Sequence, residues 1–172
     1  MQKEIRLSGS GGQGLILAGV ILAEAALIDG KRAIQSQSYG PEARGGSSKA
    51  EVIISDAEID FTKVQKCDML LCLTQAAYDK YGKDFTRVLI LDKDMEMKYP
   101  APEKVVRIPI LDTATEKLGK PMVANIVALG AVNGVMNLVS KESLLTAVID
   151  RVPKGTEELN KLALESGYDL VR

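Results

Sequence analysis

The order of hydrophobic segments is what most restricts the fold of this chain. Short runs of aliphatic and β-branched residues alternate with longer helical runs along all 172 residues. This alternation predicts an α/β fold, with a Rossmann-like, twisted, largely parallel sheet and helices on both faces. The length is typical of one domain, which we expect to span residues 1–172. Strands are expected at residues 4–8, 31–37, 49–56, 68–74, 87–92 and 104–110, and helices at 13–29, 75–85, 121–137, 141–152 and 155–168.

A glycine-rich turn joins the first expected strand to the first expected helix. In SGSGGQGLILAG, residues 8–19, Gly9, Gly11 and Gly14 have the spacing G-x-G-x-x-G. Such a turn lets a phosphate approach the N-terminus of the helix, as in dinucleotide-binding proteins. Those proteins also need an acidic residue at the end of the second strand to hold the ribose. Here that strand ends with Gln35 and Gln37, and Asp29 precedes it. The turn therefore either binds another phosphate-bearing ligand, contacts a partner subunit, or only allows a tight connection.

The composition excludes several classes of function. The net charge is −1 and aromatic residues make up 4%, so binding to nucleic acid or to an anionic membrane has no electrostatic or stacking support. There is no histidine, which removes the commonest general base and metal ligand and rules out Ser-His-Asp or Cys-His catalysis within this chain.

The cysteine content points to a reducing compartment. Cys67 and Cys72 are the two cysteines, too few for an iron–sulfur cluster, which needs about four thiolates. Five residues apart on a strand, they should point to opposite faces as buried, reduced thiols. So few cysteines, without a recognisable signal peptide or membrane span, predict a cytoplasmic protein.

A second loop rich in glycine, SYGPEARGGSS, covers residues 38–48. Loops at the carboxyl ends of parallel strands form the ligand crevice, so this loop and the glycine turn should face each other. Its Tyr39, Glu42 and Arg44 can recognise a carboxylate, a phosphate or another chain. Alternatively, the loop is a rigid surface connection with a local contact between Glu42 and Arg44.

Two further features carry polar groups. Asn125 and Asn133 share one face of a largely apolar helix, so each needs a buried partner, either in the glycine turn, in a subunit contact or nearby in its own segment. The sequence DKDMEMK, residues 92–98, pairs acids after a strand. Without a second set of ligands, we interpret it as a solvated loop rather than a magnesium site.

The motifs GSGGQG and QSQSYGPEARGG, together with AEVIISD and PMVANIVALGA, resemble those of the gamma subunit of 2-oxoacid:ferredoxin oxidoreductases. The resemblance covers nearly the whole chain. The form QSYGPEARGG is more similar to 2-oxoglutarate members than to pyruvate members. Within the family, the pyruvate, branched-chain and indolepyruvate types remain alternatives. Outside it, two further alternatives remain: a free-standing nucleotide-binding dehydrogenase and a scaffold protein without a ligand.

The resemblance implies a thiamine diphosphate-dependent reaction in which a 2-oxoacid and coenzyme A give acyl-CoA, carbon dioxide and reduced ferredoxin. It places thiamine diphosphate and magnesium between alpha and beta subunits, and iron–sulfur clusters in the beta subunit and a ferredoxin-like delta subunit. This chain would hold no catalytic residue and no metal, would be inactive alone, and would shape subunit contacts and the coenzyme A entrance. The residues implied are Gly9, Gly11, Gly12 and Gly14 for the turn, Gln13 to cap the helix or donate to a ligand, and Ser38, Tyr39, Gly40, Glu42 and Arg44 toward the partner chain and coenzyme A, with Arg44 pairing with a phosphate or an acidic partner.

Overall fold

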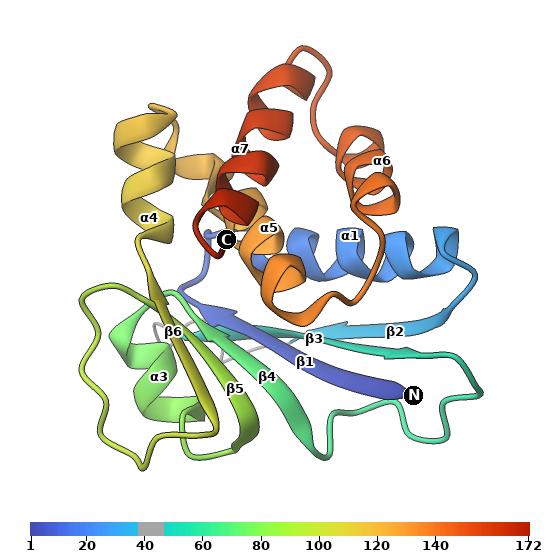
Figure 1. Ribbon diagram of the computed structural model, residues 1–172, viewed down its shortest axis with the longest axis vertical. Coiled ribbons are helices and arrows are strands. Elements are labelled where there is room, and N and C mark those ends of the chain that lie inside the picture. Colours follow the sequence, from blue (N-terminus) through green and yellow to red (C-terminus); the bar gives the residue numbers. More distant parts are fainter. Residues whose placement is uncertain (38–46) are drawn as a thin grey trace.

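A six-stranded sheet forms the centre of the molecule (Figure 1). The computed structural model describes residues 1–37 and 47–172, and the side chains of residues 85 and 86 lie outside this description. The spatial order of the strands is β2-β3-β1-β4-β5-β6. The strands are β1 (Gln2–Gly9), β2 (Arg32–Gln37), β3 (Ser48–Ser55), β4 (Cys67–Cys72), β5 (Phe85–Asp92) and β6 (Lys104–Ile108).

Most of the sheet is parallel, which confirms the predicted fold class. The pairs β1–β4, β4–β5 and β5–β6 are parallel. The exception is β3, which runs antiparallel to both β1 and β2 and separates them. Only residues 38–47 connect β2 to β3, and a parallel return usually needs a crossover of a dozen residues or more. An antiparallel return therefore follows from the short connection.

Helices cover both faces of the sheet, but unequally (Figure 1). One face carries α1, α5, α6 and α7 over the larger hydrophobic core, and the other carries α3 over a smaller core. A short segment after β6 combines α4 with a π-helical turn at Thr113–Lys117 and a 3-10 turn at Pro121–Val123. The helices are α1 (Leu15–Ile28), α3 (Gln75–Tyr81), α4 (Ile110–Asp112), α5 (Ala124–Met136), α6 (Lys141–Arg151) and α7 (Glu157–Asp169).

The backbones of α5 and α7 touch where two glycines face each other. A Cβ atom on Gly130 would lie 2.2 Å from the Leu164 carbonyl oxygen, and one on Gly167 would lie 2.0 Å from the Val127 carbonyl oxygen. Neither backbone oxygen can move without disturbing its helix. The two helices therefore pack at a separation that no larger residue permits at these positions.

The two cysteines correct one prediction. Cys67 and Cys72 both lie in the smaller core beneath α3, not on opposite faces. The pairing of β4 with β5 is irregular here, because Cys67 pairs with Phe85 and Met69 with Val88, so that β4 advances by two residues while β5 advances by three. Cys67 therefore falls outside the regular alternation that places Leu70 and Cys72 in the smaller core and Met69 and Leu71 in the larger one. Both cysteines are buried, as predicted, and no disulfide joins them.

None of the described helices has the length and apolar character needed to cross a bilayer.

Candidate functional site

The glycine turn, residues 10–14, leaves the carboxyl end of β1 and requires glycine for two different reasons. Gly12 and Gly14 have φ angles of 89° and 75°, in the left-handed region that other residues rarely adopt. At Gly9, the last residue of β1, space is the reason, because an added Cβ would lie 2.2 Å from Gln13 Oε1 and 2.9 Å from Leu15 Cδ1, and both side chains would have to move. The spacing of the glycines therefore reflects the shape of this turn, which also contains Gly11.

Gln13 fastens the turn to itself rather than capping the helix. Its Oε1 accepts a hydrogen bond from the backbone N–H of Ser10 at 2.8 Å. The N-cap residue of α1 is Gly14, and no side chain caps the helix. The predicted capping role of Gln13 is thus wrong, because its oxygen is already used within the turn. Donation by Gln13 to a ligand stays a prediction.

The N-terminus of α1 presents unpaired backbone donors at the turn. The first hydrogen bond of the helix runs from Ala18 N–H to the Gly14 carbonyl oxygen, at 3.0 Å. Within residues 1–37 and 47–172, the N–H groups of Leu15, Ile16 and Leu17 have no acceptor. The first turn of α1 carries no acidic residue that would neutralise the helix dipole. This end of the helix is therefore suited to an anion.

Asn125, at the start of α5, holds the turn from the other side. Its Nδ2 donates to the Gly14 carbonyl oxygen at 3.1 Å. The same Nδ2 atom would lie only 2.6 Å from a Cβ added to Gly14. This confirms one of the alternatives for the two asparagines. The local alternative holds for Asn133 in part: its amide bonds to Leu138 and Val139 just after α5, and it also donates to the Tyr168 hydroxyl on α7. Asn125 thus connects α5 to the turn, whereas Asn133 connects α5 to the residues that follow it and to α7.

The turn lies at the topological switch point of the sheet. The helix after β1 covers one face and the helix after β4 covers the other, and these two strands are parallel neighbours. Their ends are joined by the hydrogen bond from Leu73 N–H to the Ser8 carbonyl oxygen, at 2.9 Å. In open α/β sheets, ligands bind outside the carboxyl ends of the strands at such a point.

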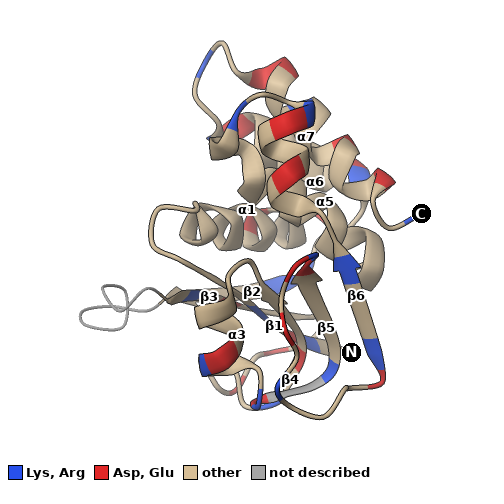
Figure 2. Cartoon of the chain, turned by 90° about the vertical axis from the view of Figure 1, so that its left-hand side faces the viewer, with Lys and Arg blue, Asp and Glu red and all other residues tan. Residues whose placement is uncertain are grey.

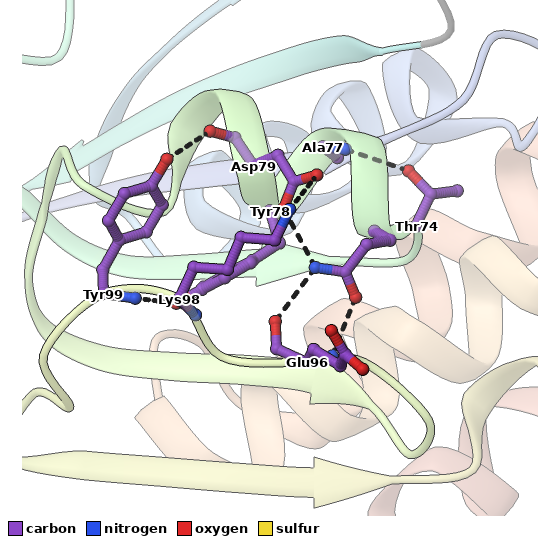
Figure 3. Close-up of polar contacts among 8 residues, drawn as sticks. Thr74, Ala77, Tyr78, Asp79, Glu96, Lys98 and Tyr99 are labelled. Carbon is purple, nitrogen blue, oxygen red and sulfur yellow. Dashed lines mark hydrogen bonds and ion pairs between the residues drawn. The ribbon is translucent and has the colours of Figure 1, made fainter.

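Residues 93–100, called here the pinned segment, leave the carboxyl end of β5 and run back beside α3 toward the start of β6 (Figure 3). Gln75, at the start of α3, bonds both backbone groups of Glu96, with Nε2 donating to the carbonyl at 2.9 Å and Oε1 accepting from the N–H at 2.8 Å. Gln75 also donates to Asp79 at 3.0 Å. The side chain of Lys98 pairs with Asp79 at 3.0 Å. These bonds from Gln75 and Lys98 lower the pKa of Asp79.

A buried tyrosine completes the attachment of the pinned segment. The hydroxyl of Tyr78 accepts from the backbone N–H groups of Lys98 and Tyr99, each at 3.0 Å, and the Tyr99 hydroxyl donates to the Asp79 carbonyl at 2.8 Å (Figure 3). Tyr78 is fully buried. Nothing in the local sequence pattern identified these contacts, because they join side chains of α3 to backbone about 20 residues further on.

Asp92, which ends β5, is a buried structural carboxylate. It accepts from the backbone N–H groups of Lys93 and Leu111, each at 2.9 Å. Burial raises the pKa of Asp92, and these two bonds oppose that effect. In the described parts of the chain, no group of three His, Cys, Asp or Glu residues could hold a metal ion. The prediction of a solvated loop is therefore wrong for Asp92, whose buried carboxylate is held by the backbone of Leu111 in α4.

The second loop begins and ends at the carboxyl end of the sheet. Gln37 ends β2 opposite Ala50, and Ser48 starts β3 opposite Gly9. Its anchors thus lie beside the glycine turn. The predicted residues Ser38, Tyr39, Gly40, Glu42 and Arg44 lie outside the described residues, so their roles stay predictions.

The second strand offers no clamp for a dinucleotide ribose. Gln35 and Gln37 stand near its end, and Gln35 Nε2 donates to Gln37 Oε1 at 2.7 Å. Gln35 also lies under α1, where a Cβ on Gly19 would meet its Cγ at 3.4 Å. The two amides thus take the place where a dinucleotide-binding protein has a carboxylate.

Comparison with known proteins places these features in a family. Residues 4–170 match the family described as pyruvate ferredoxin/flavodoxin oxidoreductase. The chain is 56% identical to 2-oxoglutarate synthase subunit KorC of Methanocaldococcus jannaschii, over 100% of this chain and 95% of that protein. It is 28% identical to ketoisovalerate oxidoreductase subunit VorA of Methanothermobacter thermautotrophicus, over 98% of this chain but only 36% of that one.

Two solved structures share the fold. The gamma subunit of a keto/oxoacid ferredoxin oxidoreductase from Geobacter sulfurreducens is 51% identical, with a TM-score of 0.88 over 98% of both chains. The 2-oxoglutarate:ferredoxin oxidoreductase from Magnetococcus marinus, with 2-oxoglutarate, coenzyme A and succinyl-CoA bound, is 22% identical, with a TM-score of 0.84 over 99% of this chain and 31% of that one.

Proposed function

This chain belongs to the pyruvate ferredoxin/flavodoxin oxidoreductase family, and on that premise we propose that it is the gamma subunit of a 2-oxoglutarate:ferredoxin oxidoreductase. The observation that carries the proposal is the 56% identity to a 2-oxoglutarate synthase subunit along the whole chain. The complex would convert 2-oxoglutarate and coenzyme A to succinyl-CoA and carbon dioxide, and pass the electrons to ferredoxin. Residues 1–172 would form one gamma domain.

The redox cofactors of such a complex do not fit the residues of this chain. Burial raises the pKa of Cys67 and Cys72 to about 12, so they are thiols rather than the thiolates that bind iron. The sequence contains no histidine. We therefore assign thiamine diphosphate, magnesium and the iron–sulfur clusters to alpha, beta and ferredoxin-like delta subunits. The low cysteine content, with no disulfide between Cys67 and Cys72, supports a cytoplasmic location for the complex.

The role proposed for this chain is to bind part of coenzyme A at the entrance to the active site. The N–H groups of Leu15, Ile16 and Leu17 and the uncompensated dipole of α1 would hold a phosphate group of coenzyme A. The second loop starts beside this point and would bring Arg44 to a phosphate or to an acidic partner. Coenzyme A is bound in the Magnetococcus marinus relative, which has the same fold.

Anaerobic purification by a tag on this chain tests the function. We expect alpha, beta and delta chains to co-purify and the eluate to reduce viologen with 2-oxoglutarate, but only when coenzyme A is present. Activity on pyruvate instead would keep the family and overturn the substrate. A chain that purifies alone, without activity on any 2-oxoacid, would overturn the proposal as a whole.

Titration of the complex with coenzyme A tests the site. Arg44→Ala should raise the KM for coenzyme A and leave the KM for 2-oxoglutarate unchanged, because only the phosphate contact is lost. If both the KM for coenzyme A and the assembly of the complex are unchanged, the role of Arg44 is wrong. Saturable binding of NAD by the chain alone would instead favour a dehydrogenase, against which the glutamines of β2 argue.

A further inference from the structure

One side of α1 carries apolar residues that the rest of the described chain covers only in part. Glu24 is the one charged residue in this helix (Figure 2). Ile16, Val20, Ala23 and Leu27, called here the α1 stripe, are spaced four, three and four residues apart and therefore share one side of the helix. Ile16 is 45% exposed and Leu27 is 57% exposed. A helix that is apolar all round is normally buried on all sides.

The α1 stripe continues into a groove at the edge of the sheet. Leu27 lines this groove of about 440 Å³ together with three apolar residues, Ala33, Ile34 and Ile59, and three charged ones, Lys31, Arg32 and Glu58. β2 is the edge strand, and its sequence RAIQSQ contains no proline and a single charge, at Arg32. Edge strands that face water are usually protected by proline, several charges or a bulge. An apolar helix face and an unprotected edge strand thus lie side by side.

Longer relatives indicate what covers this surface. The chain corresponds to 36% of ketoisovalerate oxidoreductase subunit VorA, so in that relative this domain is continuous with a further two thirds of protein. In a fused protein the polypeptide chain itself keeps the two domains together, without a cost of association. When the two parts are separate chains, a non-covalent interface must hold them together, and permanent interfaces are the most hydrophobic ones.

Resting on the proposed function, we propose that the α1 stripe and the β2 groove form the interface with the separate subunit that corresponds to the remainder of these fused relatives. The partner surface is apolar where it meets the α1 stripe, which carries no charge, and polar where it meets Lys31, Arg32 and Glu58 in the groove. Leu27 lies where the stripe meets the groove and is the central residue of this interface.

Binding of the purified partner subunit to the full chain tests this inference. The partner is the chain from the same genome that aligns with the remaining two thirds of the fused relatives. Leu27→Lys should weaken binding about 30-fold, and Ile16→Lys combined with Leu27→Lys should weaken it further, because a lysine would be placed in an apolar contact. Leu162→Lys on α7, where the leucine is 53% exposed, is the matched control and should bind like the wild type.

Each outcome decides between clear alternatives. Circular dichroism and thermal unfolding should show that all variants fold, since the residues changed are exposed. Equal binding of the wild type, Leu27→Lys and the double variant, in a complex active on 2-oxoglutarate, would overturn the interface and keep the function. Failure of the wild-type chain to bind the partner would overturn both. A dimer of this chain alone that Leu27→Lys dissociates would assign the stripe to a second copy and overturn the inference.

Discussion

Two segments that follow the carboxyl ends of strands differ in whether their backbone groups are hydrogen-bonded. In the pinned segment, the backbone of Glu96, Lys98 and Tyr99 is bonded by side chains of α3. At the glycine turn, the N–H groups of Leu15 to Leu17 have no acceptor among the described residues. Buried or half-buried backbone groups are normally paired. The difference suggests a fixed wall on one side of the crevice and a ligand-binding surface on the other.

The largest change in the free energy of unfolding should come from a substitution that changes the shape of the glycine turn. Gly14→Ala should lower the free energy of unfolding by about 2–4 kcal/mol, because the new Cβ is strained at a φ of 75° and lies 2.6 Å from Asn125 Nδ2. Urea unfolding measures this change. Gly30→Ala is the matched control, since its φ is 78° but nothing lies within 4 Å, and it should cost only about 1–2 kcal/mol. Equal losses would show that the contact with Asn125 does not matter.

A smaller change in the free energy of unfolding is expected when the attachment of the pinned segment, the fixed wall, is weakened. Tyr78→Phe removes the hydroxyl that accepts from Lys98 and Tyr99, and should lower the free energy of unfolding by about 1–3 kcal/mol. The KM of the assembled complex for coenzyme A should stay the same, because the wall does not bind the ligand. A raised KM would mean that the pinned segment takes part in binding, and the contrast between the two segments would be lost.

The ligand-binding surface should respond to charge with opposite signs in stability and binding. Ile16→Glu places an acid in the first turn of α1, so it should raise the free energy of unfolding by about 0.3–1 kcal/mol. The same carboxylate should repel a phosphate and raise the KM for coenzyme A about two- to fivefold. Ile16→Gln, which is polar but neutral, controls for the loss of the isoleucine, including the loss of its proposed contact with the partner subunit. If both variants change the KM equally, the anion site is elsewhere.

The smallest effect concerns pH. The pKa of Asp79 is lowered by its bonds with Gln75 and Lys98, so these bonds contribute above the ordinary pKa of aspartate and are lost as the pH falls through the lowered value. The amide NMR signals of Lys98 and Tyr99 should therefore shift as the pH is lowered below about 4. Asp79→Asn should remove this dependence. Signals that titrate alike in both proteins would contradict the role given to Asp79.

The success of sequence-based prediction depended on whether the cause was local. The glycine turn could be predicted because its backbone needs positive φ angles at Gly12 and Gly14, and in a sequence this need appears directly as glycine. The antiparallel direction of β3 follows from its short connection to β2, which can be read from the sequence, whereas the orientation of Cys67 accompanies an irregular pairing of β4 with β5 that the sequence does not reveal. The attachment of the pinned segment depends on Gln75 and Tyr78 meeting backbone far along the chain, for which no spacing rule exists.

The contact between Gly130 and Gly167 has a mechanical consequence. Since backbone touches backbone there, α7 cannot slide or roll on α5 without an atomic overlap, and the two helices must move together. At the other end of α5, Asn125 holds the carbonyl of Gly14. The position of the last helix of the chain and the position of the glycine turn are thus both set by α5, one at each end of that helix.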